Sequence, residues 1–386
     1  MRVLICCRPG FGHLHPMVPL ARALRDAGHE VVVATGESAA PQVAAAGLPM
    51  VSSGPSMDEA QRETAARFPE YTDLPKQQFW YRGLAMFATV IAPQVADDLI
   101  AEIDANGADL LLFEVTEFGA PIAAAARDVP AALVSWGPAR RPEFTDYGAM
   151  RAADAWRRAG LEPPADAGMR SHPFVDVCPA SLQTPWLREF AQVLPMRYVP
   201  YESPPPGDVD PVPASTGRRL VYLTLGTVFF GDLDVFRAAI AGAARCDVDV
   251  VVTIGPMGDG AALGEPPPNV HVARYVPQSE ILPRATAVVS HGGAGALMGA
   301  AVHGLPHVVM PQGADQFLNA DALERSGAGI ALRDERVSAD QVEAALRRAL
   351  EDDSIRAAAR RLAAQTAARP EPLSVVPHLE HLAASR

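Results

Sequence analysis

The first 35 residues, MRVLICCRPGFGHLHPMVPLARALRDAGHEVVVAT, predict a strand, a helix and a second strand in succession. The apolar run at 3–7 predicts the first strand, and the proline and glycines of 9–12 predict the turn after it. Apolar side chains then recur at helical spacing from Pro16 onward, and Gly28 suits the end of that helix. The β-branched stretch 30–35 predicts the second strand. Such a unit is the building block of a parallel α/β sheet.

The same alternation continues along the chain. An alanine-rich helix is predicted at 120–127 between strands at 109–113 and 131–135, and Ser338 with Gln341 forms a capping box that opens a later helix. A second series of strands is predicted at 220–225, 248–254, 287–290 and 307–310. Strands alternating with helices are typical of doubly wound parallel sheets, so the expected fold class is α/β with two Rossmann-like sheets.

A proline-dense stretch separates the two series and is the best linker candidate in the chain. We therefore expect an N-terminal domain at 1–200, a linker at 201–217, a C-terminal domain at 218–365 and a tail at 366–386. The tail predicts a short helix that packs back on the N-terminal domain. Ligands are expected in a cleft between the two domains.

The charge balance excludes several chemistries. The chain of 386 residues has 45 acidic and 33 basic side chains, a formal charge of −12, and a single lysine, Lys76. Pyridoxal phosphate enzymes and class I aldolases need an active-site lysine, and a P-loop needs a GK[ST] sequence that LPKQQ around Lys76 does not supply. Nucleic acids and anionic membranes bind basic surfaces, so neither is an expected partner.

The four cysteines and the N-terminus point to the cytoplasm. Cys6, Cys7, Cys178 and Cys246 have no CxxC spacing, which favours buried thiols over a metal site or disulfides. The apolar segment before Arg8 is too short for a signal peptide. No apolar run reaches 18 residues, so we expect no membrane span.

The densest candidate site is SHGGAGALMGA at 290–300, which follows a predicted strand and opens a predicted helix. Glycines here let the backbone approach a ligand, and the N–H groups at the helix start favour an anion. His291 adds a donor that can carry charge. The alternative is an ordinary tight turn between strand and helix. The glycines do not have the GxGxxG spacing of dinucleotide-binding folds.

Two further segments flank this loop in the sequence. RYVPQSEILPRA at 274–285 offers the ring of Tyr275 to a base, and MPQGADQFLNA at 310–320 offers Asp315 and Gln316 after a strand. A carboxylate beside an amide suits vicinal sugar hydroxyls. Taken singly, such an aspartate is more often an acid at a helix N-terminus than a ligand contact.

The order YVPQ, HGGAG and P…DQ resembles the donor-binding half of family 1 glycosyltransferases of the GT-B fold. It is most similar to the bacterial enzymes that attach activated deoxysugars to natural products. GFGHLHP, RALRDAGHEVVVAT and GRRLVYLTLGT match as well. The resemblance is weakest over 52–105 and 140–215. It implies a metal-independent transferase with no cofactor, in which a nucleoside-diphosphate sugar is the co-substrate.

The resemblance implies that His13 is the general base that deprotonates the acceptor hydroxyl. An imidazole can accept a proton at neutral pH, although a histidine in a glycine-rich turn is as often structural, as its neighbour His15 illustrates. Relatives place an aspartate at the end of a later strand to orient this imidazole. Glu114 stands at the matching position with Glu117 nearby, and the sequence leaves open which of them pairs with His13.

On the donor side, Tyr275 stands where many relatives stack a tryptophan on the base. His291 and the amides around Gly293 would hold the diphosphate. The full set that the resemblance assigns to the donor is Gly226, Thr227, Tyr275, Val276, His291, Gly292, Gly293, Ala294, Gly295, Ala296, Asp315 and Gln316.

Two positions depart from the family pattern. Ala296 is commonly serine or threonine in relatives, so a hydroxyl contact to phosphate is lost. Gly299 is often a glutamate that binds ribose hydroxyls in UDP-sugar users, and glycine fits a 2′-deoxyribose. The expected donor is therefore a dTDP-sugar in preference to a UDP-sugar.

The acceptor site must come from a region of weak periodicity. Aromatic and apolar residues gather there, which suggests a pocket for a bulky aglycone or, equally, ordinary core: Phe79, Trp80, Tyr81, Met86 and Phe87, with Phe144 and Tyr147 later. The resemblance implies a single displacement with inversion at the anomeric carbon. The DxD pairs Asp232/Asp234 and Asp247/Asp249 are expected to be helix caps and solvated edges.

Three alternatives remain open from the sequence. A sugar-nucleotide epimerase would need carboxylates near the donor sugar, where the N-terminal turn offers His13. A non-catalytic activator of another transferase would tolerate Ala296 and Gly299, and an NAD-dependent oxidoreductase would need a dinucleotide loop. A homodimer is compatible with each of them.

Overall fold

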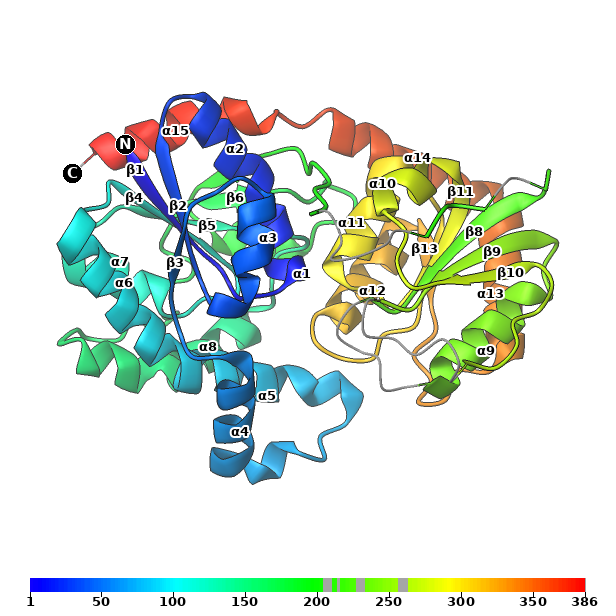
Figure 1. The fold of residues 1–386 in the computed structure, drawn as a ribbon, viewed down its shortest axis with the longest axis horizontal. Helices are drawn as coiled ribbons and strands as arrows, with labels where there is room; N and C mark the ends of the chain where they lie inside the picture. Colours follow the sequence, from blue (N-terminus) through cyan, green and yellow to red (C-terminus); the bar gives the residue numbers. More distant parts are fainter. Residues whose placement is uncertain (204–209, 214–215, 227–232, 256–262, 386) are drawn as a thin grey trace. The chain divides into compact units, whose positions relative to one another are not determined.

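The computed structural model describes residues 1–203, 210–213, 216–226, 233–255 and 263–385. The chain divides into two compact units. The N-terminal unit comprises Met1–Cys178, Gln183–Ser203 and Arg369–Arg386, and the C-terminal unit comprises Pro179–Leu182 and Pro204–Ala368. Each unit contains one parallel sheet with helices packed on it (Figure 1).

Within the described residues, the N-terminal unit has a seven-stranded sheet in the order β3-β2-β1-β4-β5-β6-β7. All of its strands are parallel, and β1 lies between β2 and β4 with Leu4 in register with Val32 and Leu111. The central strands are buried almost throughout because helices cover both faces. The strands are β1 Arg2–Cys6, β2 Glu30–Thr35, β3 Met50–Ser52, β4 Leu110–Glu114, β5 Ala131–Val134, β6 Phe174–Asp176 and β7 Val193–Pro195.

The helices of this unit are α1 Phe11–Leu14, α2 Val18–Asp26, α3 Ala40–Ala45, α4 Met57–Arg67, α5 Phe79–Leu84, α6 Ala92–Asn106, α7 Ala120–Arg127, α8 Pro142–Arg158 and α15 Pro372–Ala384. The last of them, α15, packs beside α2 although the two are far apart in sequence (Figure 1). His29 is ion-paired with Glu380 at 3.1 Å, and Arg369 with Asp176 at 2.7 Å. The C-terminal segment is thus part of the N-terminal unit.

The C-terminal unit has, within its described residues, a six-stranded parallel sheet in the order β10-β9-β8-β11-β12-β13. Its strands are β8 Arg219–Thr224, β9 Val248–Thr253, β10 Val270–Ala273, β11 Ala285–Ser290, β12 His307–Val309 and β13 Gly329–Ala331. Its helices are α9 Leu233–Ala244, α10 Gln278–Ile281, α11 Ala294–His303, α12 Gln316–Ser326, α13 Ala339–Glu351 and α14 Asp353–Ala367. One face of the sheet packs on α9 and α13 around the buried residues Val250, Phe236 and Leu346. The predicted capping box at Ser338 and Gln341 is confirmed.

The predicted start of the first helix is wrong. The helix begins at Phe11, five residues before Pro16, and continues through a 3-10 turn at His15–Met17 into α2. The backbone N–H groups of His13 and Leu14 donate to the carbonyl of Gly10, so the helical turn closes as soon as the glycine allows it. His13 therefore lies on a helix and not in a glycine-rich loop.

A long helical stretch, Lys76–Asn106, runs from a 3-10 turn through α5, a π-helical segment at Ala85–Ile91 and α6. It is long and apolar enough to cross a membrane by length and composition, a feature that the sequence analysis did not anticipate. Half of its most apolar window is buried inside the protein, where Leu84 and Leu99 are each 1% exposed. It thus contributes to the core of the N-terminal unit.

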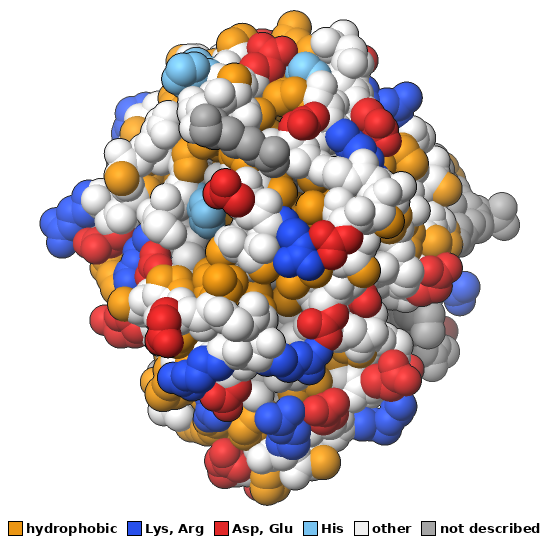
Figure 2. Space-filling model, turned by 90° about the vertical axis from the view of Figure 1, so that its left-hand side faces the viewer, with side chains coloured by type: hydrophobic (Ala, Val, Ile, Leu, Met, Phe, Trp, Pro, Cys, Tyr) orange, Lys and Arg blue, Asp and Glu red, His pale blue; other side chains and the backbone are white. Residues whose placement is uncertain are grey.

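Charge on the face shown in Figure 2 is mixed, with acidic and arginine side chains interspersed. Several of the exposed arginines of the N-terminal unit are ion-paired, among them Arg127 with Asp104 and Arg67 with Glu63. The acidic excess of the chain is therefore not gathered into one acidic field on this face.

Candidate functional site

His13 and Glu114 form a hydrogen-bonded pair in the N-terminal unit. The Nδ1 of His13 lies 3.0 Å from the Oε1 of Glu114. His13 follows β1 and Glu114 is the last residue of β4, and these strands are neighbours, so both side chains lie at the carboxyl ends of parallel strands. Ligands of open α/β sheets bind at that edge. With Nδ1 donating to the carboxylate, Nε2 retains the lone pair that can accept a proton.

The surroundings keep Glu114 ionised. Its side chain is 1% exposed, and burial opposes the charge. The neighbouring His13 and hydrogen bonds from His13 and Thr116 outweigh burial and hold the pKa of Glu114 below its ordinary value. Thr116 donates twice, from its backbone N–H at 2.7 Å and from Oγ1 at 2.6 Å. Glu117 does not pair with His13, because its carboxylate is engaged by Arg8 at 2.9 Å.

Two aromatic rings lie edge-on to the imidazole of His13. The edge-on ring of Trp136 has its centroid 4.4 Å away, and that of Phe87 lies at 6.4 Å. Trp136 follows β5 at the same edge of the sheet and was missed by the sequence analysis. Its position two residues after a buried strand is the signal that could have found it.

The aromatic residues predicted for the acceptor come together in part. Trp80 stacks on Tyr81 with centroids 3.8 Å apart, and Phe144 and Tyr147 lie at 6.2 and 5.9 Å from Trp80. Phe79 and Met86 lie on the same helical stretch and are half-buried. One aromatic cluster of α5 and α8 thus comprises Trp80, Tyr81, Phe144 and Tyr147.

Tyr147 is held tightly within this cluster. Its hydroxyl lies 2.6 Å from that of Tyr71 and accepts a hydrogen bond from Nε of Arg151 at 2.9 Å. Burial, followed by the hydrogen bond with Tyr71, raises the pKa of Tyr147 to about 12. The phenol therefore remains protonated at neutral pH and fastens the segment around Tyr71 to α8.

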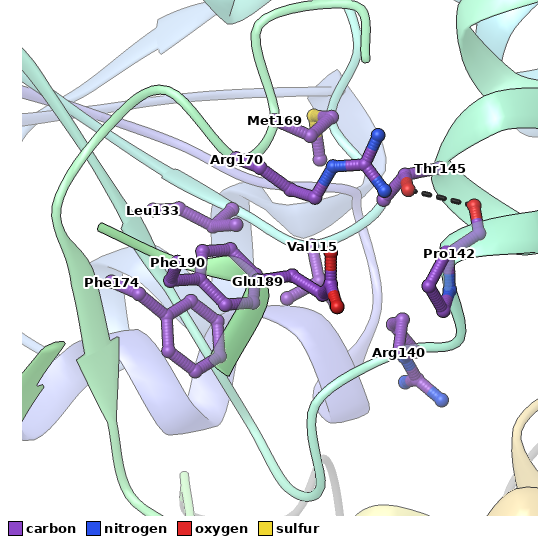
Figure 3. Close-up of a pocket in the computed structure, with 10 residues that line it drawn as sticks. All are labelled: Val115, Leu133, Arg140, Pro142, Thr145, Met169, Arg170, Phe174, Glu189 and Phe190. Carbon is purple, nitrogen blue, oxygen red and sulfur yellow. Dashed lines mark hydrogen bonds between the residues drawn. The ribbon is translucent and has the colours of Figure 1, made fainter. Parts of the chain in front are cut away.

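A small cavity lies beside β5 and β6 in the N-terminal unit (Figure 3). Its apolar lining includes Leu133, Phe174 and Phe190, with Arg170 and Glu189 among the polar residues around it. It has room for about one water molecule. It is therefore too small to receive an aglycone.

The glycine-rich loop of the C-terminal unit joins β11 to α11, as the sequence predicts. Gly292 has a φ of +83°, and Gly293 caps α11, whose first N–H groups point out of the helix end. The ring of His291 occupies the adjacent space. A Cβ at Gly226 would lie 2.6 Å from its Cε1, and a Cβ at Gly293 would lie 2.5 Å from its Nε2. Both glycines are thus required by the position of His291.

The surroundings of His291 favour its neutral form. Burial lowers its pKa to about 4, and the nearby Asp315 only partly opposes this effect. The imidazole is thus neutral at neutral pH in the protein without a ligand, and a bound anion would favour its protonation.

Buried hydrogen bonds hold the glycine-rich loop around Gly292 in place. Ser290 Oγ lies 2.8 Å from Nε2 of His307 and accepts the backbone N–H of Gly292 at 2.9 Å. Asn319 donates to the carbonyl of Gly292 at 2.9 Å and to the carboxylate of Asp315 at 2.7 Å. The sequence analysis missed Ser290, His307 and Asn319 as supporting residues, because they come from three separate elements.

Asp315 and Gln316 occupy different environments. Asp315 precedes α12 at the N-cap position and is half-buried. Gln316 is 2% exposed, and its Oε1 accepts the backbone N–H groups of Gln312 at 2.6 Å and Gly313 at 3.1 Å. The Gln316 carbonyl therefore shapes the loop, and only its amide nitrogen can serve a ligand.

The residues predicted to meet the base lie after β10. The backbone of Tyr275 exchanges hydrogen bonds with Asp210, and Val276 is 1% exposed in the core. A Cβ at Gly299 would lie 3.0 Å from Leu282 Cδ1 and 3.2 Å from Gln278 Oε1. Ala294, Gly295 and Ala296 form the first turn of α11.

Some predicted positions have other outcomes. Thr227, Asp232 and residues 204–209 and 214–215 of the predicted linker lie outside the described residues. Asp247 and Asp249 lie near Arg218, and Asp234 is paired with Arg237. In the described part of the chain, no group of three histidine, cysteine or carboxylate side chains could hold a metal ion.

The two units, with parallel sheets of seven and six strands in their described residues, match solved glycosyltransferases of the GT-B class. Residues 22–226 match the N-terminal domain, and residues 237–382 the C-terminal domain, of the family described as erythromycin biosynthesis protein CIII-like. The chain belongs to this family of EryCIII-like glycosyltransferases, and it is an enzyme of the glycosyl-transfer class.

Its relatives agree with this assignment. Tylactone mycaminosyltransferase of Streptomyces fradiae is 32% identical, with 100% of this chain and 93% of the relative covered. The glycosyltransferase SnogD from Streptomyces nogalater is 30% identical with a TM-score of 0.77, and 99% of each chain is covered. Spinosyn rhamnosyltransferase SpnG complexed with thymidine diphosphate is 29% identical with a TM-score of 0.79, covering 98% of this chain and 100% of that one. SpnG is also known complexed with spinosyn aglycone.

Proposed function

We propose that this enzyme transfers a deoxysugar from a dTDP-sugar to a hydroxyl group of a hydrophobic natural-product acceptor, with inversion and with His13 as general base. The observation that carries the proposal is the 3.0 Å hydrogen bond between His13 and Glu114, at the strand edge where α/β sheets bind ligands. The partly exposed imidazole is the group placed to meet an acceptor, since its side chain is 25% exposed while that of Glu114 is buried.

The reaction follows from this pair. Nε2 of His13 accepts the hydroxyl proton while the acceptor oxygen bonds to the anomeric carbon, and the bond from that carbon to the diphosphate oxygen breaks. One displacement inverts the anomeric configuration. Glu114 holds the imidazole in the tautomer with a proton on Nδ1 and stabilises the imidazolium that forms. The nucleoside diphosphate leaves with its charge.

The glycine-rich loop is the proposed diphosphate site. The amides of Gly293 to Ala296 at the start of α11 supply N–H groups, and His291 supplies a further donor. Asp315 and the amide nitrogen of Gln316 are proposed to contact the sugar. Gly299 has no side chain that could bind ribose hydroxyls, which supports a dTDP donor. Relatives whose titles name thymidine diphosphate support the same choice.

Calorimetric titration tests the donor. We expect dTDP to bind more tightly than UDP, because the proposed site offers no partner to a 2′-hydroxyl. Tighter binding of UDP would contradict the dTDP assignment while leaving glycosyl transfer in place.

The aromatic cluster of Trp80, Tyr81, Phe144 and Tyr147 is the proposed acceptor wall, with Phe79 and Met86 from the same helical stretch. Large rings bury apolar area at low entropic cost and suit polyketide or aromatic aglycones. The names of SpnG in complex with spinosyn aglycone and of tylactone mycaminosyltransferase support a hydrophobic acceptor.

Substitution of His13 tests the base. His13→Ala should lower turnover by roughly 10²–10⁴-fold and leave dTDP binding intact. His15→Ala is the matched control, because His15 is hydrogen-bonded to Ser203 at 3.1 Å and meets the ring of Tyr201 edge-on. Unchanged turnover of His13→Ala would refute the base.

An assay of nucleotide release tests the alternative functions. Release of free dTDP only when acceptor is added separates a transferase from an epimerase, which releases none, and from an inactive activator. We also propose a cytoplasmic location, which the buried thiols of all four cysteines support. A homodimer is to be tested by light scattering.

A further inference from the structure

A second buried ion pair lies beside the His13–Glu114 pair. Nη2 of Arg8 lies 2.9 Å from Oε2 of Glu117, and the two side chains are 4% and 1% exposed. The other carboxylate oxygen of Glu117 accepts the backbone N–H of Gly119 at 2.9 Å. A buried arginine and a buried glutamate are costly to maintain, since each loses its hydration.

The two pairs share a short segment of chain. Thr116 donates its N–H and hydroxyl to Glu114, and its carbonyl accepts from Nη2 of Arg8 at 3.4 Å. Both pairs also touch one ring. The guanidinium carbon of Arg8 lies 5.3 Å from the centroid of Phe87, and the imidazole of His13 lies 6.4 Å from it, edge to face. Arg8 and Glu117 are therefore the next charged neighbours of the His13–Glu114 pair.

The charges of these four groups balance in one state only. With both glutamates ionised and Arg8 charged, the cluster carries −1 while His13 is neutral and 0 when His13 is protonated. Without Arg8, the negative charge of Glu117 would also attract the protonated imidazole of His13. Because Arg8 neutralises Glu117, the whole charge of Glu114 remains available to the imidazolium.

We propose that the Arg8–Glu117 ion pair is a positioning pair that sets the basicity of His13 by neutralising the second buried carboxylate beside Glu114. The proposal rests on the proposed role of His13 for its meaning in catalysis. The predicted effect on the titration of the His13 imidazole can be measured without an assay of turnover.

Other titratable groups around His13 leave this balance unchanged at neutral pH. Burial raises the pKa of the thiols of Cys6 and Cys7 at the end of β1, so both are neutral there. Burial lowers the pKa of His15 to about 4, so it is neutral as well. The guanidinium carbon of Arg140 lies 5.3 Å from the ring centroid of Trp136, and its charge does not change near neutral pH.

The test is an NMR titration of selectively labelled histidines, with His13→Ala used to assign the His13 signal. Glu117→Gln leaves Arg8 uncompensated, so the titration midpoint of His13 should fall by on the order of 1 pH unit. The double variant Arg8→Met, Glu117→Gln removes both charges and should return the midpoint to that of the wild type. Glu63→Gln makes the same change in an exposed ion pair with Arg67 and is the matched control.

Two results would overturn the proposal. One is a midpoint in Glu117→Gln equal to that of the wild type, and the other is a double variant shifted as far as the single one. Arg8→Lys keeps the charge and should leave the midpoint in place even if Glu117→Gln does not fold, so a shift in Arg8→Lys would also count against the proposal.

The pH profile of turnover separates this inference from the function. If the NMR midpoint and the acid limb of kcat move together in Glu117→Gln, both assignments hold. If the midpoint moves and the acid limb does not, the ion pair acts on His13 but His13 is not the base. Thermal unfolding and dTDP binding of each variant exclude a general loss of structure.

Discussion

His291 occupies the space that a methyl group on Gly293 would need, since a Cβ there would lie 2.5 Å from Nε2 of the imidazole. We therefore expect Gly293→Ala to displace His291 or the loop. The proposed consequence is a loss of dTDP affinity of roughly tenfold or more, as for a lost charge-assisted contact of about 1.5–3 kcal/mol. Calorimetry measures it.

Gly295→Ala is the matched control for folding. Gly295 lies in the first turn of α11, and a Cβ there meets nothing within 4 Å. Alanine favours a helix over glycine by up to about 1 kcal/mol, so the Tm should stay or rise. A Tm for Gly293→Ala equal to that of Gly295→Ala would contradict the steric argument.

Glu114→Gln should keep the size and lose the charge of the side chain that holds His13. The amide can present its nitrogen to Nδ1 and favour the wrong imidazole tautomer, so turnover should fall by roughly 10²–10⁴-fold. The dTDP affinity should not change, because Glu114 belongs to the N-terminal unit and the proposed phosphate site to the other. Full activity of Glu114→Gln would remove the pair from the mechanism.

Acid should destabilise the C-terminal unit through His307. Burial lowers its pKa to about 3, whereas the unfolded side chain has a pKa of 6.5. The unfolded state binds more protons between these values, so stability is full above pH 6.5 and is lost as the pH falls, by about 1.4 kcal/mol per pH unit for one histidine. Urea unfolding at pH 7.5, 6 and 5 measures the slope.

His307→Gln isolates this effect, since glutamine does not titrate and can still meet Ser290. Below pH 6.5 the free energy of unfolding should fall less steeply with pH than in the wild type. The difference in slope should correspond to the uptake of about one proton on unfolding. Parallel slopes for the two proteins would show that His307 is not buried in its neutral form.

Trp80→Leu tests the acceptor wall. Trp80 contacts Tyr81, Phe144 and Tyr147. In its proposed role its ring also packs on the acceptor. Loss of that aromatic contact, worth about 0.5–1.5 kcal/mol, should raise the KM of a hydrophobic acceptor by roughly 2- to 12-fold. The KM of the sugar donor should not move. A change in donor KM alone would place Trp80 elsewhere in the cycle.

Most of the sheet could be predicted from the sequence, because buried parallel strands are continuous apolar runs. The strand at Glu30–Thr35 and the helix at Ala120–Arg127 were predicted to the residue. Strands of three residues, such as β6 and β13, were missed because so few residues carry no periodicity. The capping box at Ser56 and Glu59 was overlooked, although it has the same spacing as the one at Ser338.

The site could be predicted only where a motif reveals it. The glycine-rich loop is local in sequence, whereas the His13–Glu114 contact spans 101 positions and depends on β1 pairing with β4. The pairing of Arg8 with Glu117 gave no signal, because a lone arginine after a strand is usually exposed and Glu117 was considered only as a partner of His13. The low pKa of His291 could not be predicted, because the burial that causes it is not visible in the sequence.

The return of the C-terminal segment to the N-terminal unit has a consequence for protein engineering. A hybrid enzyme that joins the first half of this chain to the second half of a homologue would separate Arg369 and Glu380 from their partners Asp176 and His29. A donor-domain exchange should therefore replace residues 204–368 as an insert and keep 369–386 native. Such an exchange needs two crossover points, one before residue 204 and one after residue 368. A hybrid with a single crossover is expected to fold poorly.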